Sequence, residues 1–111
     1  HEDHRDVNRL LAMTRGRFNE AKITVWAFPV WTELIPNIGV EITSVRHLKQ
    51  TLASTYKSQE QIISISHMAV SQSAYNFRYF LTKEPSWWEV YYKIPLTEYL
   101  DLLDGFFGRF D

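Results

Sequence analysis

The sequence predicts an α+β domain with an antiparallel sheet packed against about three helices. Apolar residues recur every three or four positions near both ends and in the middle of the chain, as in helices. Between the last two of these segments they alternate with period two, as in strands. The predicted order is α-β-(β)-α-β-β-β-α: one or two short N-terminal strands and a three-stranded C-terminal meander. One domain over 1–111 is the simplest organisation.

The first half of the chain predicts two helices with short strands between them. Apolar spacing predicts a helix over 3–21, and alternation over 22–28 predicts a strand. A short helix over 30–35 and a strand over 38–42 follow, although the assignment of this part stays open between strand and helix. Residues 44–57 form the second helix. Its expected core-facing residues are Val45, Leu48, Leu52 and Tyr56, and its expected outward residues are Lys49 and Lys57.

The second half predicts the meander and a last helix. Residues 61–70, 75–81 and 86–94 each alternate between two faces and are separated by short polar links. A stripe of Leu, Tyr and Phe over 97–107 predicts an amphipathic helix, and Gly108 is a natural terminator.

The strand predicted over 86–94 has two different faces. The first is apolar and suited to a core: Trp88, Val90, Tyr92 and Ile94. The second combines aromatic rings with opposite charges: Trp87, Glu89, Tyr91 and Lys93. Strand 75–81 would add Arg78 and Phe80 to this second face. Trp, Tyr and Arg are favoured where proteins bind one another, so this face is the predicted interaction surface.

We therefore expect a non-enzymatic protein-interaction or regulatory domain. The interaction residues are Trp87, Tyr91, Arg78 and Phe80, together with Glu98 and Asp101 on the acidic last helix. The expected partner is another protein or a second copy of the chain.

A second hypothesis is a ligand-sensing domain that holds a small apolar molecule between sheet and helices. Its pocket residues would be Trp26, Trp31, His67 and Tyr79. A third and weaker hypothesis is a small enzyme built on a cone-shaped sheet, with His67 or His47 as the base. No carboxylate partner is identified for either histidine, so we assign no catalytic residue and no cofactor.

Composition excludes several classes of function. The chain has no cysteine, which rules out disulfides, thiol nucleophiles and cysteine-based metal sites. Its net charge of −1 argues against nucleic-acid binding, and no apolar run reaches the ~20 residues of a membrane span. His1 and His4 could hold a metal, but a frayed terminus is the simpler reading, and we predict no metal site. Because the chain begins with His1, we expect it to be a fragment or processed part of a longer protein. The sequence does not indicate a compartment.

Overall fold

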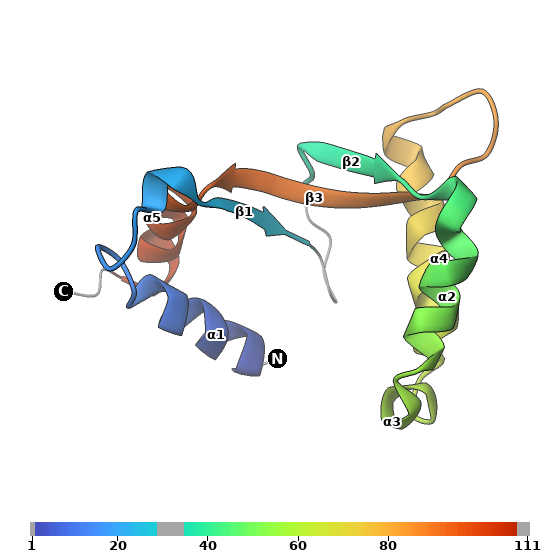
Figure 1. Cartoon of the computed structure of the whole chain (residues 1–111), viewed down its shortest axis with the longest axis horizontal. Coiled ribbons are helices and arrows are strands. Elements are labelled where there is room, and N and C mark those ends of the chain that lie inside the picture. Colours follow the sequence, from blue (N-terminus) through green and yellow to red (C-terminus); the bar gives the residue numbers. More distant parts are fainter. Residues whose placement is uncertain (1, 29–34, 109–111) are drawn as a thin grey trace. The chain divides into compact units, whose positions relative to one another are not determined.

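The computed structural model describes residues 2–28 and 35–108, and Figure 1 labels its helices and strands. Among these residues it has a three-stranded antiparallel sheet and five α-helices, which confirms the α+β class. The chain divides into two compact units: unit 1 is His1–Ile35 with Tyr92–Asp111, and unit 2 is Pro36–Tyr91. One domain over 1–111 remains a prediction.

The sheet has the strand order β1-β3-β2. β1 (Thr24–Ala27) pairs with the last four residues of β3 (Trp88–Pro95) in unit 1, where Thr24 lies opposite Pro95. β2 (Ile38–Glu41) pairs with the first four residues of β3 in unit 2. These strands confirm the predictions over 22–28, 38–42 and 86–94. The meander prediction is wrong, because β3 pairs with the two N-terminal strands.

Unit 1 packs α1 (Glu2–Ala12) against α5 (Leu96–Phe107), with the short 3₁₀ helix η1 (Glu20–Lys22) beside α5. The buried residues of this core are Ala12, Leu96, Leu100 and Leu103. The helix predicted over 3–21 is too long. The chain leaves it before Gly16, whose φ of 79° lies in the left-handed region that favours glycine.

Unit 2 is mainly helical. It contains the 3₁₀ helix η2 (Thr43–Val45), α2 (Arg46–Ser54), α3 (Lys57–Glu60), α4 (Ile65–Tyr75) and the 3₁₀ helix η3 (Asn76–Tyr79). α2 and α4 lie side by side (Figure 1). The strand predictions over 61–70 and 75–81 are therefore wrong.

The reason for this error is visible in α4. Its apolar residues are distributed around the helix axis, so no stripe with helical period marks it in the sequence. The fully buried residue on α4 is the small polar Ser73 rather than a large apolar one. The helix is also fixed from outside its own sequence, because the Glu60 carboxylate accepts hydrogen bonds from the Ser66 backbone N–H (2.9 Å) and hydroxyl (2.6 Å).

An aromatic stack forms a second packed region of unit 2, beside the α2–α4 pair of helices. The rings of Phe80 and Trp88 lie parallel, with centroids 3.8 Å apart and an interplanar angle of 12°. Gly39, opposite Val90 in the register, leaves room for the Phe80 ring. A Cβ at Gly39 would lie 2.8 Å from Cε1 and 2.9 Å from Cε2 of Phe80. Asn76 closes the arrangement by donating from Nδ2 to the Trp88 carbonyl (3.0 Å).

Candidate interaction surface

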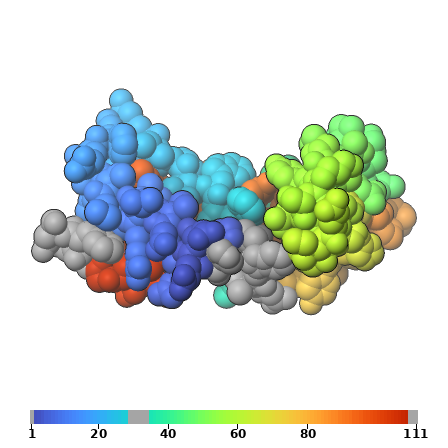
Figure 2. All heavy atoms as spheres, turned by 90° about the horizontal axis from the view of Figure 1, so that it is seen from below, coloured from blue at the N-terminus to red at the C-terminus, as the bar shows by residue number. Residues whose placement is uncertain are grey.

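The largest departure from the predicted core lies on α2. The residues expected to face the core are exposed: Val45 is 44% exposed, Leu48 51%, Leu52 65% and Tyr56 63%. Leu48 and Leu52 lie one turn apart on α2, whereas Val45 ends η2 just before it and Tyr56 comes two residues after its last residue, Ser54. We call this row the α2 stripe. The light-green atoms of α2 and α3 lie at the surface of unit 2 in Figure 2. A contiguous apolar row of this kind is unusual on a surface that only contacts water.

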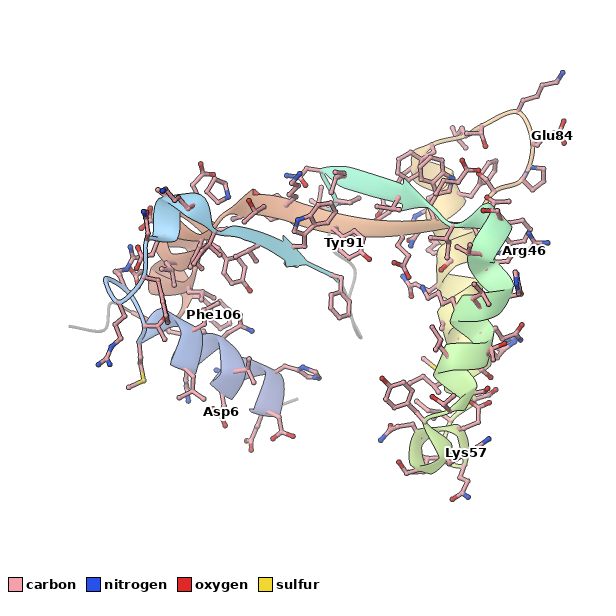
Figure 3. All side chains as sticks on the ribbon, in the orientation of Figure 1. Asp6, Arg46, Lys57, Glu84, Tyr91 and Phe106 are labelled. Carbon is pink, nitrogen blue, oxygen red and sulfur yellow. The ribbon has the colours of Figure 1, made fainter. Side chains whose placement is uncertain are left out.

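The two charged residues of α2 make contacts within unit 2. The Arg46 guanidinium, labelled in Figure 3, lies 4.2 Å from the centroid of the Trp87 ring. Lys49 was predicted to point outward, and this is wrong: its Nζ lies 2.9 Å from Glu89 Oε1 and donates to Ser73 Oγ at 2.8 Å. Basic groups on α2 therefore stabilise the packing of α2, α4 and β3.

Two polar neighbours of the α2 stripe are uncharged and already hydrogen-bonded to backbone carbonyls. The Thr51 hydroxyl donates to the His47 carbonyl (3.0 Å), and the Thr55 hydroxyl donates to the Leu52 carbonyl (2.6 Å). A polar group with its hydrogen bond satisfied costs much less to bury than one that loses its partner. This side of α2 can consequently be covered by another surface at little polar cost.

The two rings predicted as the main interaction residues have partners inside unit 2. Trp87 is covered on one face by Arg46, and its backbone N–H donates to Thr43 Oγ1 (3.0 Å). The Tyr91 hydroxyl donates to Glu89 Oε2 at 2.5 Å (Figure 3 labels Tyr91). Both rings are half-buried. The opposite-charge partner of Glu89 is Lys49.

The hydrogen bond between Tyr91 and Glu89 changes the pKa of both side chains. Burial, together with the hydrogen bond to the Glu89 carboxylate, raises the pKa of Tyr91 to about 12. For Glu89, burial raises the pKa, but the hydrogen bonds from Tyr91 and Lys49 lower it by more, so its pKa lies below the ordinary value. Tyr91, Glu89 and Lys49 therefore connect β3 to α2.

Arg78 and Phe80 do not share a sheet face with Trp87 and Tyr91, because no strand forms over 75–81. Phe80 belongs to the stack with Trp88. The Arg78 guanidinium lies 3.8 Å from the ring centroid of Tyr75 and 4.2 Å from that of Tyr79, and it donates to the Tyr79 hydroxyl at 2.8 Å. This places Arg78 beside a predicted pocket residue, in an exposed aromatic cluster.

The acidic residues of α5 belong to unit 1. Asp101 accepts a hydrogen bond from Arg15 Nη2 (3.0 Å), and Asp104 accepts one from the same nitrogen (2.8 Å). Glu98 is exposed in the first turn of α5, where a negative charge stabilises the helix. Asp101 therefore has a structural role in joining α5 to the turn after α1.

The residues predicted to line a ligand pocket are not assembled within either unit. Trp26 lies on β1 in unit 1, with Lys93 Nζ 4.7 Å from its ring centroid. His67 and Tyr79 belong to unit 2, where both side chains are exposed. Trp31 lies outside the described residues.

An open depression of about 300 Å³ is instead present in unit 1, between α1 and α5. Phe106, labelled in Figure 3, is one of the residues that line it. The Tyr99 hydroxyl donates to Asn8 Oδ1 across it (2.6 Å), and burial raises the pKa of Tyr99. The residues that line it are His4, Arg5, Asn8, Tyr99, Leu103, Phe106 and Phe107.

Residues 2–28 and 35–108 contain no cluster of three His, Asp or Glu side chains that could hold a metal. His1, one of the two histidines weighed as ligands, is not in that range. No helix in the same part of the chain is long and apolar enough to cross a bilayer.

The sequence predicted a core-facing stripe on α2, and it did not reveal that this stripe is an exposed surface. Its periodicity was visible, but periodicity identifies an apolar face without saying what covers it. A signal did exist in the neighbouring uncharged Ser44, Thr51 and Thr55, since solvent-facing helix positions more often carry Lys or Glu.

Comparison with known proteins adds no relative: no family model, no curated protein and no solved structure matches the chain.

Proposed function

We propose that this chain is a non-enzymatic protein-interaction domain that binds its partner through the α2 stripe. The observation that carries the proposal is the exposure of Leu48 and Leu52 on α2, together with that of Val45 and Tyr56 next to its two ends. Interfaces place apolar and aromatic side chains at their centre and few charges, which is the composition of this face. The sheet residues Trp87 and Tyr91 then act indirectly, by holding α2 in place through Arg46 and Lys49.

Site-specific photocrosslinking in cells tests this proposal. A photoreactive amino acid replaces Thr51, at the edge of the α2 stripe, so that the apolar residues stay intact. A matched variant carries it at Gln50, which is also exposed but lies on the opposite side of α2. We expect protein adducts from position 51 and few from position 50. Equal yields, or no adduct from position 51, would overturn the proposal.

The depression between α1 and α5 supports a second candidate function, the binding of a small amphipathic molecule. Its volume of about 300 Å³ is at the lower end for ligand sites. Its polar side includes Arg5 and Asn8, while Phe106 and Phe107 supply an apolar wall. Native mass spectrometry of protein purified from cells tests this candidate. A retained molecule that is lost in a Phe106→Asp variant supports it, and a bare chain argues against it.

A further inference from the structure

We propose that the depression between α1 and α5 binds a small carboxylate with an aromatic or alkyl body, and that Arg5 holds the carboxylate group. This inference rests on the second candidate function, the binding of a small amphipathic molecule, and names its ligand class. It concerns unit 1 alone, where α1 and α5 pack against each other (Figure 1). It is carried by the charge of the lining residues, by the distribution of charge around α1 and by the apolar wall of α5.

The residues that line the depression include a positive charge and no negative one. Arg5 is the arginine among them, and neither Asp nor Glu is present in this lining. Arg5 forms no ion pair within residues 2–28 and 35–108, so its guanidinium keeps its donors for a ligand. A planar guanidinium can donate two parallel hydrogen bonds to one carboxylate, which makes arginine well suited to this group.

Two of the acidic residues on α1 lie on the opposite side of the helix from this charge. The side that faces α5 is identified by Asn8, which accepts a hydrogen bond from a hydroxyl of α5 at 2.6 Å, and by Ala12, which is buried with residues of α5. Arg5 shares this side, because it is separated from both by helical spacing. The same spacing places Asp3 and Asp6 on the other side of α1. The positive charge is therefore on the side where a ligand would lie.

A second cation on α1 adds to the attraction for an anion. Arg9 lies one turn after Arg5, and its guanidinium lies 5.3 Å from the ring centroid of Phe107, which lines the depression. Asp6 Oδ1 lies 3.6 Å from Arg9 Nη1, but both side chains are half exposed or more, so this ion pair is weak. Like charges one turn apart on a helix repel each other, and a bound anion would reduce that repulsion.

The side of the depression that α5 forms is apolar and determines the body of the ligand. The Phe106 and Phe107 rings meet edge to face, with centroids 4.8 Å apart, and Leu103 beside them is buried. Phe106 is 69% exposed, so an aromatic or alkyl group that covers it removes apolar surface from water. An ammonium group on the ligand would meet Arg5 and no acidic lining residue. A carboxylate without an ammonium group therefore fits better than an amino acid or an amine.

NMR titration of the full chain with a series of phenyl compounds tests this inference. The compounds differ in charge: 3-phenylpropanoate is an anion, 3-phenylpropan-1-ol is neutral, phenylalanine is a zwitterion and 2-phenylethylamine is a cation. We expect 3-phenylpropanoate to shift the backbone amide signals of Asn8 and Leu103, with a millimolar dissociation constant that suits its size. The other compounds should bind about fivefold more weakly or not at all. The amide signal of Ser73, in unit 2, should not shift.

A pair of variants assigns the charge preference to one residue. Arg5→Gln should weaken the binding of 3-phenylpropanoate about fivefold and leave that of 3-phenylpropan-1-ol unchanged, because it removes the charge and keeps a long polar side chain. Arg17→Gln is the matched control, since Arg17 is exposed in unit 1 and does not line the depression. It should bind all the compounds like the unmodified chain. The amide spectra also check that both variants are folded.

The outcomes separate this inference from the candidate function on which it rests. Equal affinity for 3-phenylpropanoate and 3-phenylpropan-1-ol, or an unchanged affinity in Arg5→Gln, overturns the carboxylate assignment and leaves the binding of an apolar molecule standing. Tighter binding of 2-phenylethylamine also overturns the assignment. A chain whose Asn8 and Leu103 signals shift with none of the compounds overturns the inference. If that chain also retains no molecule when purified from cells, the second candidate function is overturned with it.

Discussion

Gly39→Ala should destabilise unit 2 by forcing the Phe80 ring out of its place. The added Cβ would lie 2.8 and 2.9 Å from two carbons of that ring, well inside van der Waals contact. Overpacking of this kind costs about 1–3 kcal/mol, and a displaced Phe80 also loses about 0.5–1.5 kcal/mol of stacking on Trp88. Alanine restricts the unfolded chain, which offsets about 0.4–1 kcal/mol. We expect a net loss of about 1–3 kcal/mol in the free energy of unfolding.

Urea unfolding followed by circular dichroism measures this loss as a lower midpoint at an unchanged slope. Gly105→Ala is the matched control, because Gly105 lies inside α5 and a Cβ there meets nothing within 4 Å. It should stabilise the chain by about 0.5–1 kcal/mol. In a Phe80→Ala background the change at Gly39 should cost close to nothing. An equal cost with and without the Phe80 ring would refute the steric reasoning.

Three further predictions concern polar contacts. The raised pKa of Tyr91, about 12 against 10.0 ordinarily, keeps its proton bound in the folded chain after the unfolded chain has lost it. The stability it contributes is therefore present below about pH 10 and lost as the pH rises through about 12, and Tyr91→Phe should remove this alkaline loss from urea midpoints. Hydrogen bonds from Ser66 lower the pKa of Glu60, so Ser66→Ala should return it towards the ordinary value in an NMR titration, and an unchanged pKa would contradict the contact. Arg15→Met should lower the free energy of unfolding by about 1–2 kcal/mol, because it leaves Asp101 and Asp104 on α5 without their shared donor. A urea midpoint equal to that of the unmodified chain would show that these ion pairs do not stabilise the fold.

A strand and a helix with strong local patterns, β3 and α5, could be predicted from the sequence. β3 alternates core-suited and mixed residues, and the structure buries Val90 and Ile94 from the predicted core face. α5 carries a broad apolar stripe and ends at Gly108, whose φ of 81° explains the termination. In each case the residues that determine the element lie within the element itself.

α4 could not be predicted because its determinants lie elsewhere. Its start depends on Glu60 and its buried contact on Lys49, neither of which belongs to the helix. The alternation of Ile63 and Ile65 with serines imitated a strand. The prediction that Arg78 and Phe80 share a sheet face with Trp87 was wrong for a related reason, because it required a strand over 75–81 that does not form.

The division of the chain has a consequence for the order of folding. Unit 2 is one continuous segment, Pro36–Tyr91, whereas unit 1 is assembled from the residues before and after it. Pairing Thr24 with Pro95 requires the closure of a long loop, and loop closure slows the formation of distant contacts. During synthesis unit 2 can complete its contacts once Tyr91 has emerged, while β1 must wait for the end of β3. We therefore expect the N-terminal segment to be the last part of the chain to gain protection from proteases.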